Sequence, residues 1–176
     1  MERSECSLCG GMRVTFSSDG VATPCSCHIK DLVKQELSRF IPAPPPTQKV
    51  RDVLISLEGS GDQSVLISAL PGKQHRTLLL MYLTRVLFSK KSFIVADDGE
   101  LIDWYFSDSD KLTLREVRKD IVVIMSGLTA ITHKWATKLP LEAARVWGSS
   151  SKVIFYDHQS DGEVAAALNA LGFKKI

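Results

Sequence analysis

The sequence lacks any apolar run long enough to cross a membrane and any strong excess of one charge. Its most apolar stretch, 78–88, contains Arg85 and is shorter than the roughly 18–20 apolar residues that a spanning helix needs. The 22 Lys and Arg residues nearly balance the 20 Asp and Glu residues, so the overall charge indicates no nucleic-acid-binding surface. The N-terminus also lacks the apolar segment of a secretory signal. We therefore expect a cytoplasmic protein with no membrane partner.

Cysteine is absent after residue 27, and all four cysteines lie before that point. Cys6 and Cys9 form a C-x2-C pair, and Cys25 and Cys27 form a C-x-C pair after fifteen intervening residues. In the cytoplasm thiols stay reduced, so this clustering favours a metal site over disulfides. The spacing predicts four thiolates around one structural Zn²⁺, in a closed site without catalytic chemistry. Replacement of Cys25 or Cys27 by His28 as a ligand remains an alternative.

The residues between the two cysteine pairs predict a β-hairpin. Residues 12–16 and 21–23 have the composition of short strands, and a D-G turn at 18–20 separates them. Two glycines follow Cys9 and allow the positive φ values that a tight metal-binding turn needs. The first part of the chain is therefore expected to be a zinc ribbon, which a helix over 31–40 then follows.

A proline-rich stretch and a change of pattern divide the rest of the chain. We expect a zinc ribbon with its short helix at 1–41, a stiff linker at 42–49 and an α/β domain at 50–176. A proline-rich ligand for a partner domain is the alternative reading of the linker. The expected strands are 64–68, 92–96, 120–125 and 152–156, and the expected helices are 76–90, 101–106, 133–147 and 161–171. Short apolar strands between helices predict three layers around a mainly parallel sheet.

The turn after the first of these strands has the position of a phosphate-binding loop but not its residues. Such a loop needs several glycines, a Lys for the phosphates and a hydroxyl for Mg²⁺. Only Gly72 fits, because His75 occupies the Lys position and Arg76 the hydroxyl position, while Lys73 is displaced. Binding of a phosphate or nucleotide through these side chains and the helix N-terminus remains an alternative.

The acidic half of an ATPase site is also missing. The strand at 120–125 runs into Ser126 and Gly127 with no carboxylate, although such a strand must supply the acids that hold Mg²⁺ and position water. Loss of the Lys, the hydroxyl and the acids together removes both phosphate and metal binding. We therefore expect no catalytic residues and no enzymatic activity.

With these motifs the chain resembles the DnaC/DnaI-type bacterial helicase loaders and the transposon ATPases of the IstB type. The resemblance covers the cysteine ribbon, the strand, turn and helix at 65–83, the segment 93–106, and a sensor-like strand at 152–157. It implies a P-loop or AAA+-like core behind a zinc ribbon, and an N-terminal part that contacts a replicative helicase. The chain departs from the family in both degenerate ATPase elements, and little room is expected for an arginine finger or a C-terminal lid.

Three functions follow from these observations as hypotheses. The first is a non-catalytic pseudo-ATPase adaptor that binds a replicative helicase or another AAA+ protein in DNA replication or mobile-element biology. The second is a divergent ATPase that uses Lys73 with Asp97, Asp98 or Asp157, although helix caps and solvated loops explain such acids equally well.

The third hypothesis is a zinc ribbon that binds nucleic acid. Four basic residues lie in or near the expected ribbon: Arg13, Lys30, Lys34 and Arg39. Acidic residues alternate with them, so a solvated face of mixed charge is the other interpretation. Nucleic acid therefore remains a possible partner beside the protein partner.

Overall fold

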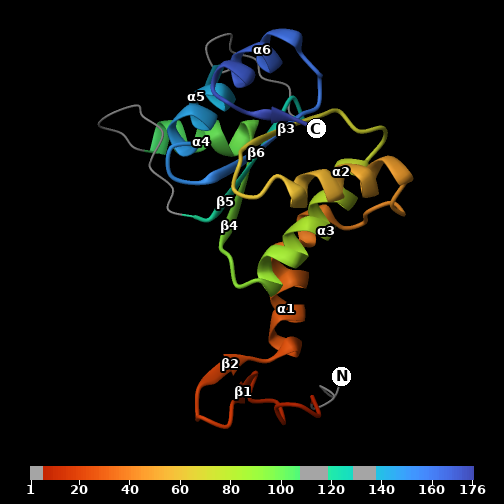
Figure 1. Cartoon of the computed structure of the whole chain (residues 1–176), viewed down its shortest axis with the longest axis vertical. Helices are drawn as coiled ribbons and strands as arrows, with labels where there is room; N and C mark the ends of the chain where they lie inside the picture. The colour runs from red at the N-terminus through yellow and green to blue at the C-terminus, as the bar shows by residue number, and fades with distance from the viewer. Residues whose placement is uncertain (1–5, 108–118, 129–137) are drawn as a thin grey trace.

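The computed structural model describes residues 6–107, 119–128 and 138–176, and these residues form two parts. A two-stranded hairpin lies at one end of the molecule, and an α/β domain makes up the remainder (Figure 1). Helix α1, Ser26–Glu36, leads from the hairpin to this domain, and the short 3₁₀ helix η1, Ser38–Phe40, follows it. The α/β class and the N-terminal cysteine cluster are therefore confirmed.

The α/β domain is built on a five-stranded sheet in the order β4-β5-β6-β3-β7, in which all neighbouring strands are parallel. The strands are β3 (Val65–Ser68), β4 (Phe93–Asp97), β5 (Ile121–Ser126), β6 (Lys152–Asp157) and β7 (Lys174–Lys175). The first four lie within one residue of the predicted positions, because each is a short apolar run. The sequence prediction missed β7, whose two lysines carry no apolar signal.

Helices cover both faces of the sheet and make the three expected layers. They are α2 (Gln48–Gly59), α3 (Gln74–Phe88), α4 (Asp98–Ser107), α5 (Leu139–Trp147) and α6 (Gly162–Ala170). Successive strand residues point to opposite faces, so β3, β4, β5 and β6 each contribute to two apolar clusters. Ile67 and Tyr156 pack with α2, α3 and η1, whereas Leu66 and Phe155 pack with α4, α5 and α6. In the described ranges no helix is long and apolar enough to cross a membrane.

Several helix boundaries differ from the sequence prediction. Helix α1 begins five residues earlier than expected, because the Cys25 carbonyl accepts hydrogen bonds from the backbone N–H groups of His28 and Ile29. Helix α4 begins at Asp98 rather than Leu101. The expected helix at 133–147 is described only from residue 138, and its residues 133–137 lie outside the described ranges.

Helix α2 was not predicted, and it changes the environment of the proline-rich stretch. Thr47 caps the helix by accepting a hydrogen bond from the Val50 N–H, and Val50, Leu54 and Leu57 are buried at helical spacing. The range 42–49 that the sequence indicated as a linker therefore ends inside α2. Leu37 of the N-terminal part packs in the same apolar cluster as α2 and α3.

Candidate metal centre and phosphate-loop-like turn

The ribbon is held together by a tight turn and a short β-hairpin. The Cys6 carbonyl accepts hydrogen bonds from the N–H groups of Cys9 and Gly10, at 3.2 and 2.8 Å. Strands β1, Val14–Phe16, and β2, Ala22–Pro24, then pair antiparallel. These contacts follow the predicted hairpin, and they bring the two cysteine pairs to the same end of it.

All four predicted ligands meet in one cluster. The sulfurs of Cys6, Cys9, Cys25 and Cys27 lie within 4.8 Å of one another. The Cys6 and Cys25 sulfurs are 3.8 Å apart, and those of Cys9 and Cys27 are 3.5 Å apart. A tetrahedron with Zn–S bonds of ~2.3 Å has edges of about 3.8 Å, so this donor set fits a tetrahedral thiolate site. The four cysteines can therefore hold a metal ion.

The second cysteine pair stands at the N-terminal end of α1. Cys25 directly precedes the helix and Cys27 lies in its first turn, where the helix dipole favours thiolates. The hydrogen bond from the Cys27 backbone N–H lowers the pKa of Cys25 to about 7. His28 is not part of the sulfur cluster, so the described geometry favours four thiolate ligands.

The turn after β3 uses its backbone N–H groups within the protein. The N–H of Ala69 donates to Ser160 Oγ at 3.1 Å, and the N–H of Leu70 donates to the Tyr156 hydroxyl at 3.2 Å. A phosphate-binding loop needs such groups to point at its ligand. Sequence reasoning missed Tyr156 and Ser160 as partners of this turn, since no local signal links residues so far apart in the chain.

The four predicted turn residues are placed differently from one another. Gly72 has a φ of +57°, a conformation that suits glycine, and Lys73 is the exposed residue that precedes α3. His75 is buried and Arg76 is half-buried one residue later. Although these residues are neighbours in the sequence, their side chains differ in burial, and they do not line one common site.

His75 packs inward rather than toward a ligand. Its ring stacks on Tyr156 with centroids 5.2 Å apart, and the His158 ring lies 6.3 Å away. Burial, together with the neighbouring positive charges of Arg76, His158 and Lys73, lowers the pKa of His75 to about 4. The residue at the position of the phosphate-binding Lys is therefore neutral at pH 7.

The proline-rich stretch is hydrogen-bonded to the start of α3. Thr77 Oγ1 donates to the Pro44 carbonyl at 2.6 Å, and Gln74 Nε2 donates to the Pro45 carbonyl at 3.0 Å. Gln74 Oε1 in turn accepts a hydrogen bond from the Thr47 N–H. The polar side chains in the first turn of α3 thus hold this stretch against the helix.

Asp97, the last residue of β4, and Glu100, in the first turn of α4, together cap that helix. The Glu100 N–H donates to Asp97 Oδ1 and the Asp97 N–H donates to Glu100 Oε2, which is a capping box. The Arg39 guanidinium binds both Glu100 oxygens at 3.1 Å and Asp97 Oδ2 at 3.3 Å. Arg39, one of the four basic residues in or near the expected ribbon, therefore ties η1 to the carboxyl edge of the sheet.

The other two candidate acids are buried and also hydrogen-bonded to backbone. Asp98 Oδ2 accepts from the Gly127 N–H at 2.9 Å. The Asp157 carboxylate accepts from the N–H groups of Gln159 and Asp161, at 3.0 and 2.8 Å. The candidate acids of a divergent ATPase therefore all make contacts that fix loops or helix ends.

The remaining basic residues of the ribbon belong to a surface of mixed charge. Arg13 is 3.9 Å from Asp31 in an exposed ion pair, and Lys30 is exposed. The side chain of Lys34 lies outside the described residues. The mixed charge expected from the sequence is thus present on the described ribbon.

A scan against protein-family models finds no matching family, and a search of curated proteins finds no match.

Proposed function

We propose that this protein is a non-catalytic adaptor whose zinc ribbon docks on a protein partner. The resemblance of the sequence to helicase loaders suggests a replicative helicase, or another AAA+ protein of DNA replication or mobile elements, as that partner. In this proposal the α/β domain keeps the scaffold of an AAA+ ATPase without its chemistry, and the protein acts in the cytoplasm.

The observation that carries the proposal is the apolar surface of the ribbon. Nine large hydrophobic side chains are exposed among the described residues, and four belong to the ribbon: Leu8, Met12, Phe16 and Val21. Each of these four is between 59% and 68% exposed. A contiguous patch of exposed apolar side chains marks a protein interaction site, and the proposal takes these four residues as such a patch. A metal-tied hairpin holds such side chains rigidly, so little entropy is lost on binding.

The cysteine cluster supports zinc as the bound metal. Four thiolates with tetrahedral spacing favour Zn²⁺ over hard ions such as Mg²⁺ or Ca²⁺. The ion would link the turn after Cys6 to the start of α1, and four protein ligands would leave no open position for a reacting group. Its role in the proposal is therefore structural.

The turn before α3 supports the non-catalytic part of the proposal. The N–H groups of Ala69 and Leu70 already have acceptors within the protein, and His75 is neutral. Asp97 and Glu100 are occupied by Arg39. A nucleotide would have to displace these contacts without gaining a metal-binding acid in return.

The strand order distinguishes the α/β domain from two common doubly wound folds. Numbered within the α/β domain, the strands lie in the order 2-3-4-1-5. This order differs from the 3-2-1-4-5-6 and 2-1-3-4-5 orders of dinucleotide- and flavin-binding doubly wound sheets. It places the first strand between the last two.

The docking proposal is tested by co-purification with a replicative helicase. We expect the wild-type protein to retain the helicase. Phe16→Ser should weaken binding at least about tenfold, because it removes an aromatic side chain that the complex would bury. Ile55→Ser is the matched control, since Ile55 is similarly exposed at 66% but lies on α2. The zinc content of each variant is measured in the same samples.

Two results would contradict the docking proposal. One is the absence of binding to a helicase and to any other replication or transposition component. The other is equal loss of binding by the Phe16 and Ile55 variants. Calorimetric titration with Mg·ATP tests the non-catalytic part separately, and micromolar affinity would contradict it.

A further inference from the structure

The N-terminal arm, residues 6–36, comprises the ribbon and α1, and it projects from the α/β domain (Figure 1). Among the side chains that the structure describes there, only those of Cys9 and Cys25 are buried, at 3% and 1% exposure. Large apolar side chains such as Met12 and Phe16 are instead 65% and 61% exposed. The described interior of the arm therefore consists of candidate metal ligands rather than an apolar core.

The hairpin and the helix of the arm are both too small to be stable alone. An isolated two-stranded hairpin is at best marginally stable in water. Helix α1 has 11 residues, fewer than the ~12–15 that an isolated helix needs, and none of its described side chains is buried. All four cysteines are free, so no disulfide links the hairpin to the helix. Units below about 40 residues usually need disulfides, metals or oligomerisation to fold.

The cysteine cluster joins all parts of the arm. The Cys25 N–H donates to the Arg13 carbonyl at 2.8 Å, beside the paired strands of the hairpin. The Cys25 carbonyl accepts from the His28 N–H at 3.0 Å at the start of α1, and Cys27 lies in the first turn of that helix. Four sulfurs held by one metal ion would therefore fix the first turn, the hairpin and the start of the helix together.

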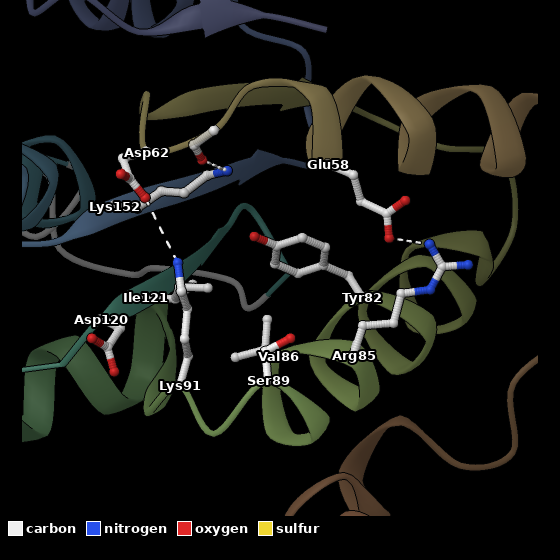
Figure 2. A pocket seen from close by; sticks show the side chains of 11 residues that line it. Glu58, Asp62, Tyr82, Arg85, Val86, Ser89, Lys91, Asp120, Ile121 and Lys152 are labelled. Atoms are coloured by element: carbon white, nitrogen blue, oxygen red, sulfur yellow. Dashed lines mark hydrogen bonds and ion pairs between the residues drawn. The ribbon is translucent and has the colours of Figure 1, made fainter.

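The α/β domain is held together by contacts of its own. Leu37, directly after the arm, is fully buried, and both apolar clusters consist of residues from Leu37 onward. Around the pocket between α2, α3 and β6, Glu58 pairs with Arg85, and Lys152 donates to the Gly61 carbonyl (Figure 2). These contacts join α2 to α3 and to the sheet without any residue of the arm. The boundary between the two parts therefore falls at Leu37.

We propose that the arm is a metal-dependent switch. Residues 6–36 fold when the four cysteine thiolates bind a metal ion such as Zn²⁺, and they unfold when it is removed, while the α/β domain stays folded. The free energy of metal binding is then the folding free energy of the arm. The four exposed apolar side chains of the ribbon are presented together only in the metal-loaded protein. This last step rests on the proposed docking function, whereas the folding step does not.

Hydrogen exchange of the full chain, followed by mass spectrometry, tests the folding step without any partner. The protein is compared when loaded with Zn²⁺, after chelation, and after Zn²⁺ is added back, with the metal content measured in each sample. A reductant is present throughout, so disulfides cannot replace the metal. We expect chelation to abolish the protection of amides in β1, β2 and α1, and Zn²⁺ to restore it. Amides of α3 and of the five-stranded sheet should stay protected.

A pair of ribbon variants separates metal binding from other changes in the hairpin. Cys9→Ser should reproduce the chelated state even with Zn²⁺ present, because it removes one ligand. Thr15→Val is the matched control, since it removes the contact between the Thr15 and Thr23 hydroxyls but no ligand, and it should keep both zinc and protection. Unchanged protection of residues 6–36 in metal-free protein would overturn the proposal. Loss of protection that extends into α3 and the sheet would also overturn it.

Co-purification of a replicative helicase with the loaded and the metal-free protein tests the docking step separately. We expect only the loaded protein to retain the helicase. If the metal-free protein binds equally well while its arm is unprotected, the dependence of docking on the metal is wrong. If the loaded protein binds no helicase, the proposed function fails, and the exchange experiment still decides the folding step.

Discussion

Acidification is expected to destabilise this protein through His75. The ring is 7% exposed and stacks on Tyr156, and three positive groups face it: Arg76, Lys73 and, when protonated, His158. Burial is the largest cause of its low pKa, and no described acid lies near enough to offset the charges. The folded protein therefore holds His75 neutral at pH values where the unfolded chain takes up a proton.

The size of this effect follows from the two pKa values. The pKa of His75 falls from 6.5 in the unfolded chain to about 4 in the folded protein. At 1.36 kcal/mol for each pKa unit, this difference corresponds to about 3 kcal/mol of unfolding free energy. Because the folded pKa is the lower one, the neutral ring contributes its full stability above pH 6.5. That contribution is lost progressively as the pH falls from 6.5 toward 4.

Urea unfolding of the wild type and His75→Phe at several pH values measures this effect. Phe keeps the stacking on Tyr156 and cannot be protonated, and His75 Nδ1 has no partner to lose. We expect similar unfolding free energies at pH 7, and a difference that grows to about 3 kcal/mol in favour of His75→Phe near pH 4. If the unfolding free energies of the two proteins change in parallel with pH, the reasoning is refuted. His75 would then take up a proton as easily in the folded protein as in the unfolded chain.

Two further predictions concern the ribbon and the proline-rich stretch. Cys9→Ser should abolish stoichiometric zinc in metal analysis. The thermal transition of the α/β domain should remain, since neither apolar cluster includes ribbon residues 6–25. Loss of that transition would contradict this prediction. Thr77→Val should cost about 1 kcal/mol, or about 2–4 °C in calorimetry, because it removes the hydrogen bond to the Pro44 carbonyl. Thr84→Val is the control, since it removes only the hydrogen bond from Thr84 Oγ1 to the Leu80 carbonyl within α3, and it should lower stability less. An equal loss of stability in the two variants would contradict the role of the Pro44 contact.

The sequence by itself was enough to predict the cysteine cluster, the hairpin between its pairs and four of the five strands. These features depend on short-range patterns: ligand spacing within a turn, a D-G turn and apolar runs of four to six residues. The sequence prediction missed helix α2, although Val50, Leu54 and Leu57 recur at the spacing of an amphipathic helix. The start of α1 depended on the Cys25 carbonyl, which accepts hydrogen bonds from the backbone N–H groups of His28 and Ile29.

Only the tertiary structure decided what surrounds the turn before α3. The acceptors of the Ala69 and Leu70 N–H groups, Ser160 and Tyr156, come from the other end of the chain, and Arg39 reaches Glu100 across 61 positions. Parallel strands bring such distant residues to one edge because β3 lies beside β6 in the sheet. Local residue spacing cannot encode which distant residues lie beside the turn. The sequence therefore showed which phosphate-binding side chains the turn lacks. Only the fold showed which residues accept hydrogen bonds from its backbone N–H groups.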